Sequence, residues 1–172
     1  MLFSNNQIDI STLPKSSDLE LTPISKHYLW IILINISLVY LVIIGVLSII
    51  NQFSGDSGVQ DAFEYLISII CVLFVISVIF AIIGFKKRKY AMREKDITYS
   101  HGYIVNKTLT LPFNRIQHIE IARSFLARKF GVSTLKIYSA GQSGGDIAIR
   151  GLPKAIAQTQ YDFLTKIINE RL

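Results

Sequence analysis

Two long stretches without a charged residue constrain this chain more than any other feature of its sequence. They run from Tyr28 to Gly55 and from Tyr65 to Phe85, and the second leads directly into the basic block Lys86-Lys87-Arg88-Lys89. A hydrocarbon core about 30 Å thick requires roughly 20 apolar residues of helix, so each stretch is long enough to cross a membrane. The sequence therefore predicts a hairpin of two membrane-spanning helices.

The distribution of charge predicts on which side of the membrane each part lies. Between the two stretches the only charged residues are Asp56, Asp61 and Glu64, whereas residues 86–172 carry 16 basic and 6 acidic side chains, a net charge of +10. Lys and Arg resist translocation, so the basic block marks the cytoplasmic side. We expect a multi-pass protein of the cell membrane with both termini in the cytoplasm.

These boundaries divide the chain into three expected parts. Residues 1–25 are a polar cytoplasmic tail, residues 26–89 form the hairpin, and residues 90–172 form a cytoplasmic domain. Within the hairpin we expect spans at about 28–50 and 62–85, joined by an outside loop at about 51–61. The single cysteine, Cys71, lies inside the second span and has no partner for an intrachain disulfide.

Beyond the basic block, apolar and polar residues alternate with a period of two, which is typical of antiparallel strands. A short helix is expected at about Ser124 to Phe130, ended by Gly131, and a glycine-rich turn at Gly141 to Gly145. The strand candidates are Ile97–Tyr99, Tyr103–Val105, Thr108–Leu111, Ile116–Ile121, Leu135–Tyr138 and Ile147–Ile149.

The chain ends in a stretch with helical periodicity that begins at about Lys154. Its apolar residues recur at three- and four-residue steps and predict one apolar stripe, made of Ile156, Phe163, Leu164, Ile167 and Ile168. Such a helix can plug the open end of a small, strongly curved sheet. The expected fold class is thus an α+β membrane protein: a transmembrane hairpin, then an antiparallel split barrel like a pleckstrin-homology (PH) domain, capped by a C-terminal amphipathic helix.

Several short motifs strengthen this expectation, because together they resemble a known family. They are Arg115-Ile116-Gln117-His118-Ile119, Ser124 to Gly131, Ile149-Arg150-Gly151-Leu152-Pro153, Gly102-Tyr103 and Thr110-Leu111-Pro112. The pattern is similar to that of the second bacterial PH-like family, long labelled a domain of unknown function, and it covers about Lys89 to Leu172. With two spans in front, the chain resembles the small membrane proteins called YdbS-like.

The resemblance implies a fold and a location, and little chemistry. Relatives of this kind are commonly found beside a larger protein with several copies of the same domain, which implies a membrane complex. No catalytic residues are established for the family, so none are carried over to this chain.

Signatures of an enzyme are nearly absent from the sequence. His27, His101 and His118 fall at an interface, a turn and a strand, without a second ligand at metal spacing. The glycines from Gly141 to Gly145 lack the Lys-Ser/Thr that completes a phosphate loop. We expect no catalytic residues, no cofactor and no metal.

Basic and aromatic residues are the better candidates for a contact site. Arg123, Phe125, Arg128 and Lys129 cluster on and beside the short helix, where they serve either as a partner or lipid contact or as a solvated face. Lys86, Lys87, Arg88 and Lys89 are expected to determine topology, and the same residues are suited to acidic lipid.

The sequence therefore predicts a non-enzymatic, membrane-anchored assembly module that binds one or more protein partners, including a larger PH-like relative. The alternative is a sensor of anionic lipid headgroups in the inner leaflet, and an unrecognised membrane enzyme ranks third. Membrane lipids are expected contacts in every case, and homo-oligomerisation stays open. Nucleic acid is disfavoured, because the domain is tethered to the membrane and shows no nucleic-acid-binding motif.

Overall fold

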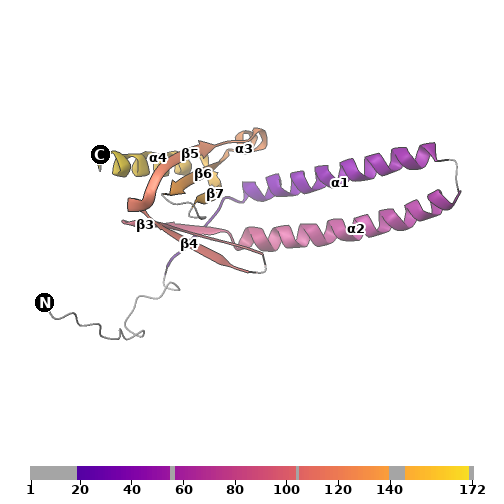
Figure 1. Ribbon diagram of the computed structural model, residues 1–172, viewed down its shortest axis with the longest axis horizontal. Helices are drawn as coiled ribbons and strands as arrows, with labels where there is room; N and C mark the ends of the chain where they lie inside the picture. Colours follow the sequence, from indigo (N-terminus) through magenta and orange to yellow (C-terminus); the bar gives the residue numbers. More distant parts are fainter. Residues whose placement is uncertain (1–18, 55–56, 104, 140–145, 171–172) are drawn as a thin grey trace, which may run out of the picture.

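The structure, a computed structural model, describes residues 19–54, 57–103, 105–139 and 146–170. Two long helices, α1 (His27–Phe53) and α2 (Ser57–Lys86), lie side by side as an antiparallel hairpin, and all strands gather at one end of it (Figure 1). The N-terminal part of the tail and the Gly141–Gly145 turn lie outside the described residues. The expected combination of a helical hairpin, antiparallel sheets and a C-terminal helix is confirmed.

Both helices are long and apolar enough to span a membrane, with mean hydropathies of 2.7 and 3.3 over their most apolar windows. Only 6% and 11% of those windows is buried inside the protein, whereas the core helix of a soluble protein is mostly buried. Their length, composition and exposure fit a small membrane protein with two transmembrane helices. Each helix extends beyond the expected span, so the connecting loop is shorter than residues 51–61.

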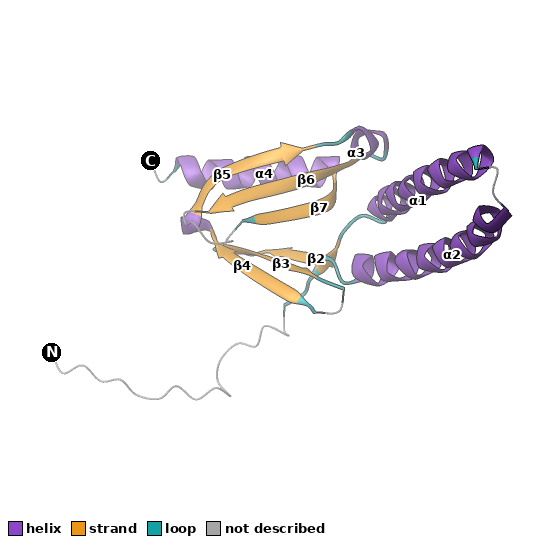
Figure 2. Cartoon of the chain, turned by 45° about the vertical axis from the view of Figure 1, so that its right-hand side comes forward, coloured by secondary structure: helices purple, strands orange, loops and turns teal. Residues whose placement is uncertain are grey.

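The strands form two antiparallel sheets (Figure 2). The first sheet has the order β1-β2-β3-β4 and the second has the order β5-β6-β7. The bounds are β1 Thr22–Pro23, β2 Lys89–Met92, β3 Asp96–His101, β4 Lys107–Pro112, β5 Ile116–Ala122, β6 Val132–Ser139 and β7 Ile147–Pro153. A 3-10 turn, η3 (Phe113–Arg115), links the sheets, and the short helix α3 (Phe125–Lys129) joins β5 to β6.

The last described residues of the expected tail belong to the folded domain. Thr22 and Pro23 pair with Tyr90 and Lys89 of β2, and Ile24 is buried in the main core with 4% exposure. β1 and β2 can pair because the two antiparallel helices between them lead the chain back to the end of the hairpin at which it entered. The chain segments before α1 and after α2 therefore lie at the same end of the hairpin.

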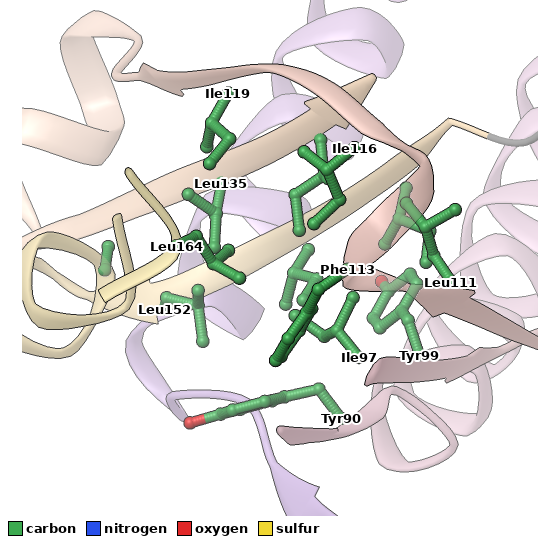
Figure 3. Packing of buried hydrophobic residues seen from close by; sticks show 14 of the residues in the cluster. Tyr90, Ile97, Tyr99, Leu111, Phe113, Ile116, Ile119, Leu135, Leu152 and Leu164 are labelled. Carbon is green, nitrogen blue, oxygen red and sulfur yellow. The ribbon is translucent and has the colours of Figure 1, made fainter. Parts of the chain in front are cut away.

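The core lies between the two sheets and beneath the C-terminal helix. Figure 3 shows Ile97 and Phe113 on one side of this core, and Leu135 and Leu164 on the other. All four residues are at most 1% exposed, so the domain has a closed hydrophobic core.

Helix α4 (Lys154–Asn169) begins at the expected residue but presents a different face to the core. Ala157 and Leu164 are completely buried, whereas Ile156 and Phe163 are 40% and 42% exposed, so their assignment to the buried stripe is wrong. The residues of α4 that face the core are spaced alternately four and three positions apart in the sequence. Ile156 and Phe163 each lie one position before a residue of this observed stripe, on its flank. The stripe includes Ala157, Tyr161, Leu164 and Ile168.

Two local predictions are tested by the backbone around the sheets. The short helix is confirmed: the Ser124 hydroxyl accepts a hydrogen bond from the Ala127 amide at 3.2 Å, and Gly131 follows with φ +67°. The Tyr103–Val105 strand candidate is wrong. Its described residues lie in the turn between β3 and β4, because Gly102, with φ +148°, ends the extended run there.

Candidate functional site

A cleft of about 340 Å³ lies between the two sheets, close to where the domain meets the helical hairpin. Strands β3 and β4 supply one wall and β7 supplies the other, and Arg88 reaches the cleft from the segment after α2. The lining residues are Arg88, Tyr99, His101, Leu109, Asp146, Ile147, Ala148 and Arg150. Two arginines and a histidine thus face a single carboxylate.

The cleft is held at this place by a tight junction between β7 and the start of α1. The Ser25 amide donates a hydrogen bond to the Gly151 carbonyl at 2.9 Å. Gly151 has φ +82°, and a Cβ atom there would lie 2.7 Å from the Tyr28 side chain. Only glycine suits both the backbone conformation and this close approach. The junction therefore places Arg150, the preceding residue, beside the first turn of α1.

Arg88 is anchored at the same junction from the other helix. Its guanidinium lies over the Tyr28 ring, 5.6 Å from the centroid, and its Nη2 atom donates a hydrogen bond to the Tyr103 hydroxyl at 3.4 Å. A guanidinium held by an aromatic face keeps donors for a further partner. The position of this side chain is thus restrained, and no described acidic residue forms an ion pair with it.

His101 is a titratable group in the lining of the cleft. Its ring stacks on Tyr99, with centroids 5.0 Å apart, and its Nδ1 atom is buried and has no hydrogen-bond partner among the described residues. Burial lowers the pKa of the imidazole below 6.5, and the charges of Arg88, Lys107 and Arg150 lower it further. An uncharged imidazole with an orphan ring nitrogen can receive a proton when an anion enters the cleft.

Asp146 and Tyr99 contribute less to binding an anion. One carboxylate oxygen of Asp146 already accepts a hydrogen bond from the Ser139 amide at 3.0 Å. Burial raises the pKa of the Tyr99 hydroxyl, which therefore stays protonated at neutral pH. With His101 neutral, the charged lining residues Arg88, Arg150 and Asp146 leave the cleft net positive, which suits a phosphate or a carboxylate group.

The short helix α3 lies away from this cleft, against the start of α1 (Figure 1). Phe125 is 71% exposed, and Arg128 and Lys129 are exposed as well. Arg123 is half-buried, and its Nε atom has no hydrogen-bond partner among the described residues. The four residues predicted to form one contact site are thus near one another, but they form a separate surface from the cleft.

The basic block is divided between several environments. Lys86 ends α2 and Lys89 begins β2, and both are exposed. Lys87 Nζ donates a hydrogen bond to the Tyr103 carbonyl at 3.0 Å, and Arg88 turns into the cleft. Only Arg88 of these four residues lines the cleft.

Sequence reasoning missed the convergence of Arg88, His101 and Arg150. Arg150 stands within the motif Ile149 to Pro153, and His101 precedes a predicted turn, but neither position indicates a shared site. His101 belongs to β3 of the first sheet and Arg150 to β7 of the second. The two residues meet only because the two sheets pack against each other. Among the described residues there is no group of three or more His, Cys, Asp or Glu side chains that could hold a metal ion.

Comparison with known proteins identifies a family. The sequence profile of the bacterial PH domain matches residues 19–170, a range that contains the strand before the hairpin, both long helices and the whole β domain. No curated protein and no solved structure matches the chain. The matched range covers far more than half of the sequence, and the chain belongs to the bacterial PH domain family.

Proposed function

We propose that this protein is a membrane-anchored binding module that holds the anionic headgroup of a lipid in the cleft between its sheets. PH-like domains generally mediate lipid or protein interactions and are generally not catalytic. The single observation that carries the proposal is the convergence of Arg88, His101 and Arg150 at the domain's junction with the hairpin. Guanidinium groups bind phosphate through paired donors, and these lie next to a membrane surface.

The location of the cleft favours a headgroup over a dissolved anion. Arg88 lies two residues after the end of α2 and contacts Tyr28 in the first turn of α1. Both helix ends stand at the membrane surface if the helices span it, so a headgroup of the adjacent leaflet needs to move little to reach the arginines. A free phosphate has the same chemistry without this advantage in local concentration.

The domain is proposed to face the cytoplasm, as the positive block after α2 predicts. Pairing of β1 with β2 supports one part of this topology, because it puts the segments flanking the hairpin on the same side. A reporter that is active only outside the cytoplasm, fused after Leu172, should therefore remain silent. A strong signal would reverse the orientation and remove the inner leaflet as the source of the ligand.

The headgroup proposal is tested on the full chain, purified in mild detergent and analysed for retained lipids by native mass spectrometry. Wild-type protein should retain phosphatidylglycerol in preference to phosphatidylcholine. Arg150→Gln should weaken retention by roughly tenfold or more, because a hydrogen bond to a charged group contributes about 1.5–3 kcal/mol. Arg115→Gln is the matched control, since Arg115 is exposed on η3, outside the cleft, and the substitution removes the same charge.

The outcomes separate the alternative ligands. Equal retention by wild type and Arg150→Gln would overturn the cleft as a headgroup site. Tight binding of inorganic phosphate or glycerol phosphate without lipid preference would identify a soluble anion instead. Assembly with a protein, including a larger relative, stays a prediction; a co-purifying protein that survives high salt and is lost in Arg150→Gln would assign the cleft to that partner.

A further inference from the structure

Three large side chains of the β domain are exposed at the end that faces the hairpin. Phe125 on α3 is 71% exposed, and Val105 and Tyr103 in the β3–β4 turn are 68% and 46% exposed. We call these three residues the membrane-facing rim. Exposed aromatic and branched apolar residues gathered at one end of a domain are candidates for contact with a membrane or a partner.

The packing of α3 gives the depth of Phe125 relative to the membrane. Ile31 of α1 is buried against Ala127 and Val132, with Leu126 and Phe130 around them. α1 has 27 residues, so it is about 40 Å long at 1.5 Å per residue, close to the 40–45 Å of a bilayer with its headgroup layers. Ile31 lies four residues from the start of α1, about 6 Å along its axis. α3 is therefore level with the headgroup layer.

The β3–β4 turn reaches the same level along the other helix. A Cβ atom on Gly84 would collide with the Tyr103 ring, so this ring lies directly on the backbone of α2. Gly84 is two residues from the end of α2, and Lys87 Nζ holds the Tyr103 carbonyl at 3.0 Å. The two elements that carry the rim thus contact the hairpin on both sides, α3 at the start of α1 and the β3–β4 turn at the end of α2.

The charges around the rim complement an anionic leaflet. Residues 97–119 and 121–139 contain basic side chains and no Asp or Glu. The carboxylate between them, Glu120, is already engaged by Lys136 Nζ at 3.3 Å and by the Tyr138 hydroxyl at 3.1 Å. The ion pairs among the described residues do not include Arg128 or Lys129. Basic side chains that flank exposed apolar ones are typical of segments that lie in a membrane interface.

We propose that the membrane-facing rim is embedded in the headgroup layer of the bilayer, so that the β domain docks on the membrane at two places. Phe125 enters beside α1, and Val105 and Tyr103 enter beside α2. Trp30, which is 59% exposed in the first turn of α1, lies at the same level as Phe125 and belongs to the interface that both enter. The bilayer, rather than a protein partner, covers the exposed aromatic residue of α3. This inference does not depend on what the cleft binds.

The lone cysteine of the chain makes a direct test practical. In a Cys71→Ala background, Phe125→Cys and Val105→Cys are each labelled with an environment-sensitive fluorophore, and the full chain is reconstituted into vesicles of phosphatidylcholine and phosphatidylglycerol. Both probes should shift to shorter emission wavelength, resist quenching by aqueous iodide and be quenched by lipids that carry a doxyl group near the headgroup. Asn114→Cys on η3 is the matched control, because Asn114 is exposed at the opposite end of the domain.

The control probe should show the reverse pattern, with strong iodide quenching and little lipid quenching. If the probes at 125 and 105 behave like the probe at 114, the rim is in water and the proposal is wrong. If only one of them contacts lipid, docking at two places is wrong. Adding Arg150→Gln to each labelled variant should leave the quenching unchanged, which separates rim insertion from headgroup binding in the cleft.

Discussion

The helical hairpin and the β domain place their apolar residues in opposite ways. Along α1 and α2, side chains such as Leu41 and Tyr65 are 70% and 76% exposed, while Leu135, Ile149 and Leu164 in the domain are 0% exposed. The apolar outer surface of the hairpin fits helices that span a membrane, where lipid is the solvent and the backbone hydrogen bonds are satisfied within each helix. The domain buries its apolar residues because water is its solvent. The extent of the exposed apolar surface therefore distinguishes the two regions.

By this comparison the membrane-facing rim resembles the hairpin, although it belongs to the β domain in sequence. Phe125 and Val105, at 71% and 68%, are as exposed as Leu41 of α1, at 70%. At η3, Phe113 is 1% exposed and its ring contacts that of Phe163, which is 42% exposed. The rim proposal therefore rests on the position of its residues beside the hairpin and not on exposure alone.

The largest expected effect comes from breaking the buried arrangement of the domain. Leu164→Asp places a carboxylate at a completely buried position, at a cost of several kcal/mol against a stability of about 5–15 kcal/mol. We expect loss of the tertiary structure of the domain while the hairpin stays helical. Near- and far-ultraviolet circular dichroism of the full chain in detergent measures the two parts separately.

Phe163→Asp is the matched control for this substitution. Phe163 lies one residue away on the same helix, but it is 42% exposed, and its ring meets that of Phe113 edge to face with the centroids 6.0 Å apart. We expect a clearly smaller loss of thermal stability than with Leu164→Asp. Equal effects of the two changes would contradict the orientation of α4.

A smaller effect is expected at the junction that joins the two regions. Gly151→Ala adds a Cβ atom 2.7 Å from Tyr28 and forces a non-glycine residue to φ +82°, so it should cost roughly 1–3 kcal/mol. Gly45→Ala in α1 is the control, because no atom lies within 4 Å of a Cβ there. Thermal unfolding of both variants checks the prediction, and equal melting temperatures would mean that the junction is loose.

The smallest expected effect is a pH dependence centred on His101. Its pKa is lowered in the folded state, so the unfolded state binds the proton more readily, and stability should be present above about pH 6.5 and decline as the pH falls through the folded pKa. His101→Gln should flatten this decline, with exposed His118→Gln as the control. An unchanged profile would exclude His101 as its origin. The groups that face the imidazole are Arg88, Tyr99, Lys107, Asp146 and Arg150.

Local patterns in the sequence were sufficient to predict most of the elements. The uncharged stretches predicted both long helices, because a span is recognised from the composition of consecutive residues. The short helix α3 was predicted with Gly131 as its end, and α4 was predicted to begin at about Lys154, directly after Pro153; both residues act on their immediate neighbours. The apolar stripe of α4 was predicted less well. Apolar residues stand at adjacent positions of this helix, so their spacing alone does not show which of two neighbours faces the core.

Only the tertiary structure decided which distant residues meet. β1 joins the domain across the hairpin, and Arg88, His101 and Arg150 converge although His101 and Arg150 are 49 positions apart and lie in different sheets. Convergence of this kind depends on strand pairing, register and the close approach at Gly151, none of which is encoded by adjacent residues. By itself the sequence determined two helices long and apolar enough to span a membrane, followed by a basic β domain. Packing between elements determined where that domain presents its charge and its exposed aromatic residues.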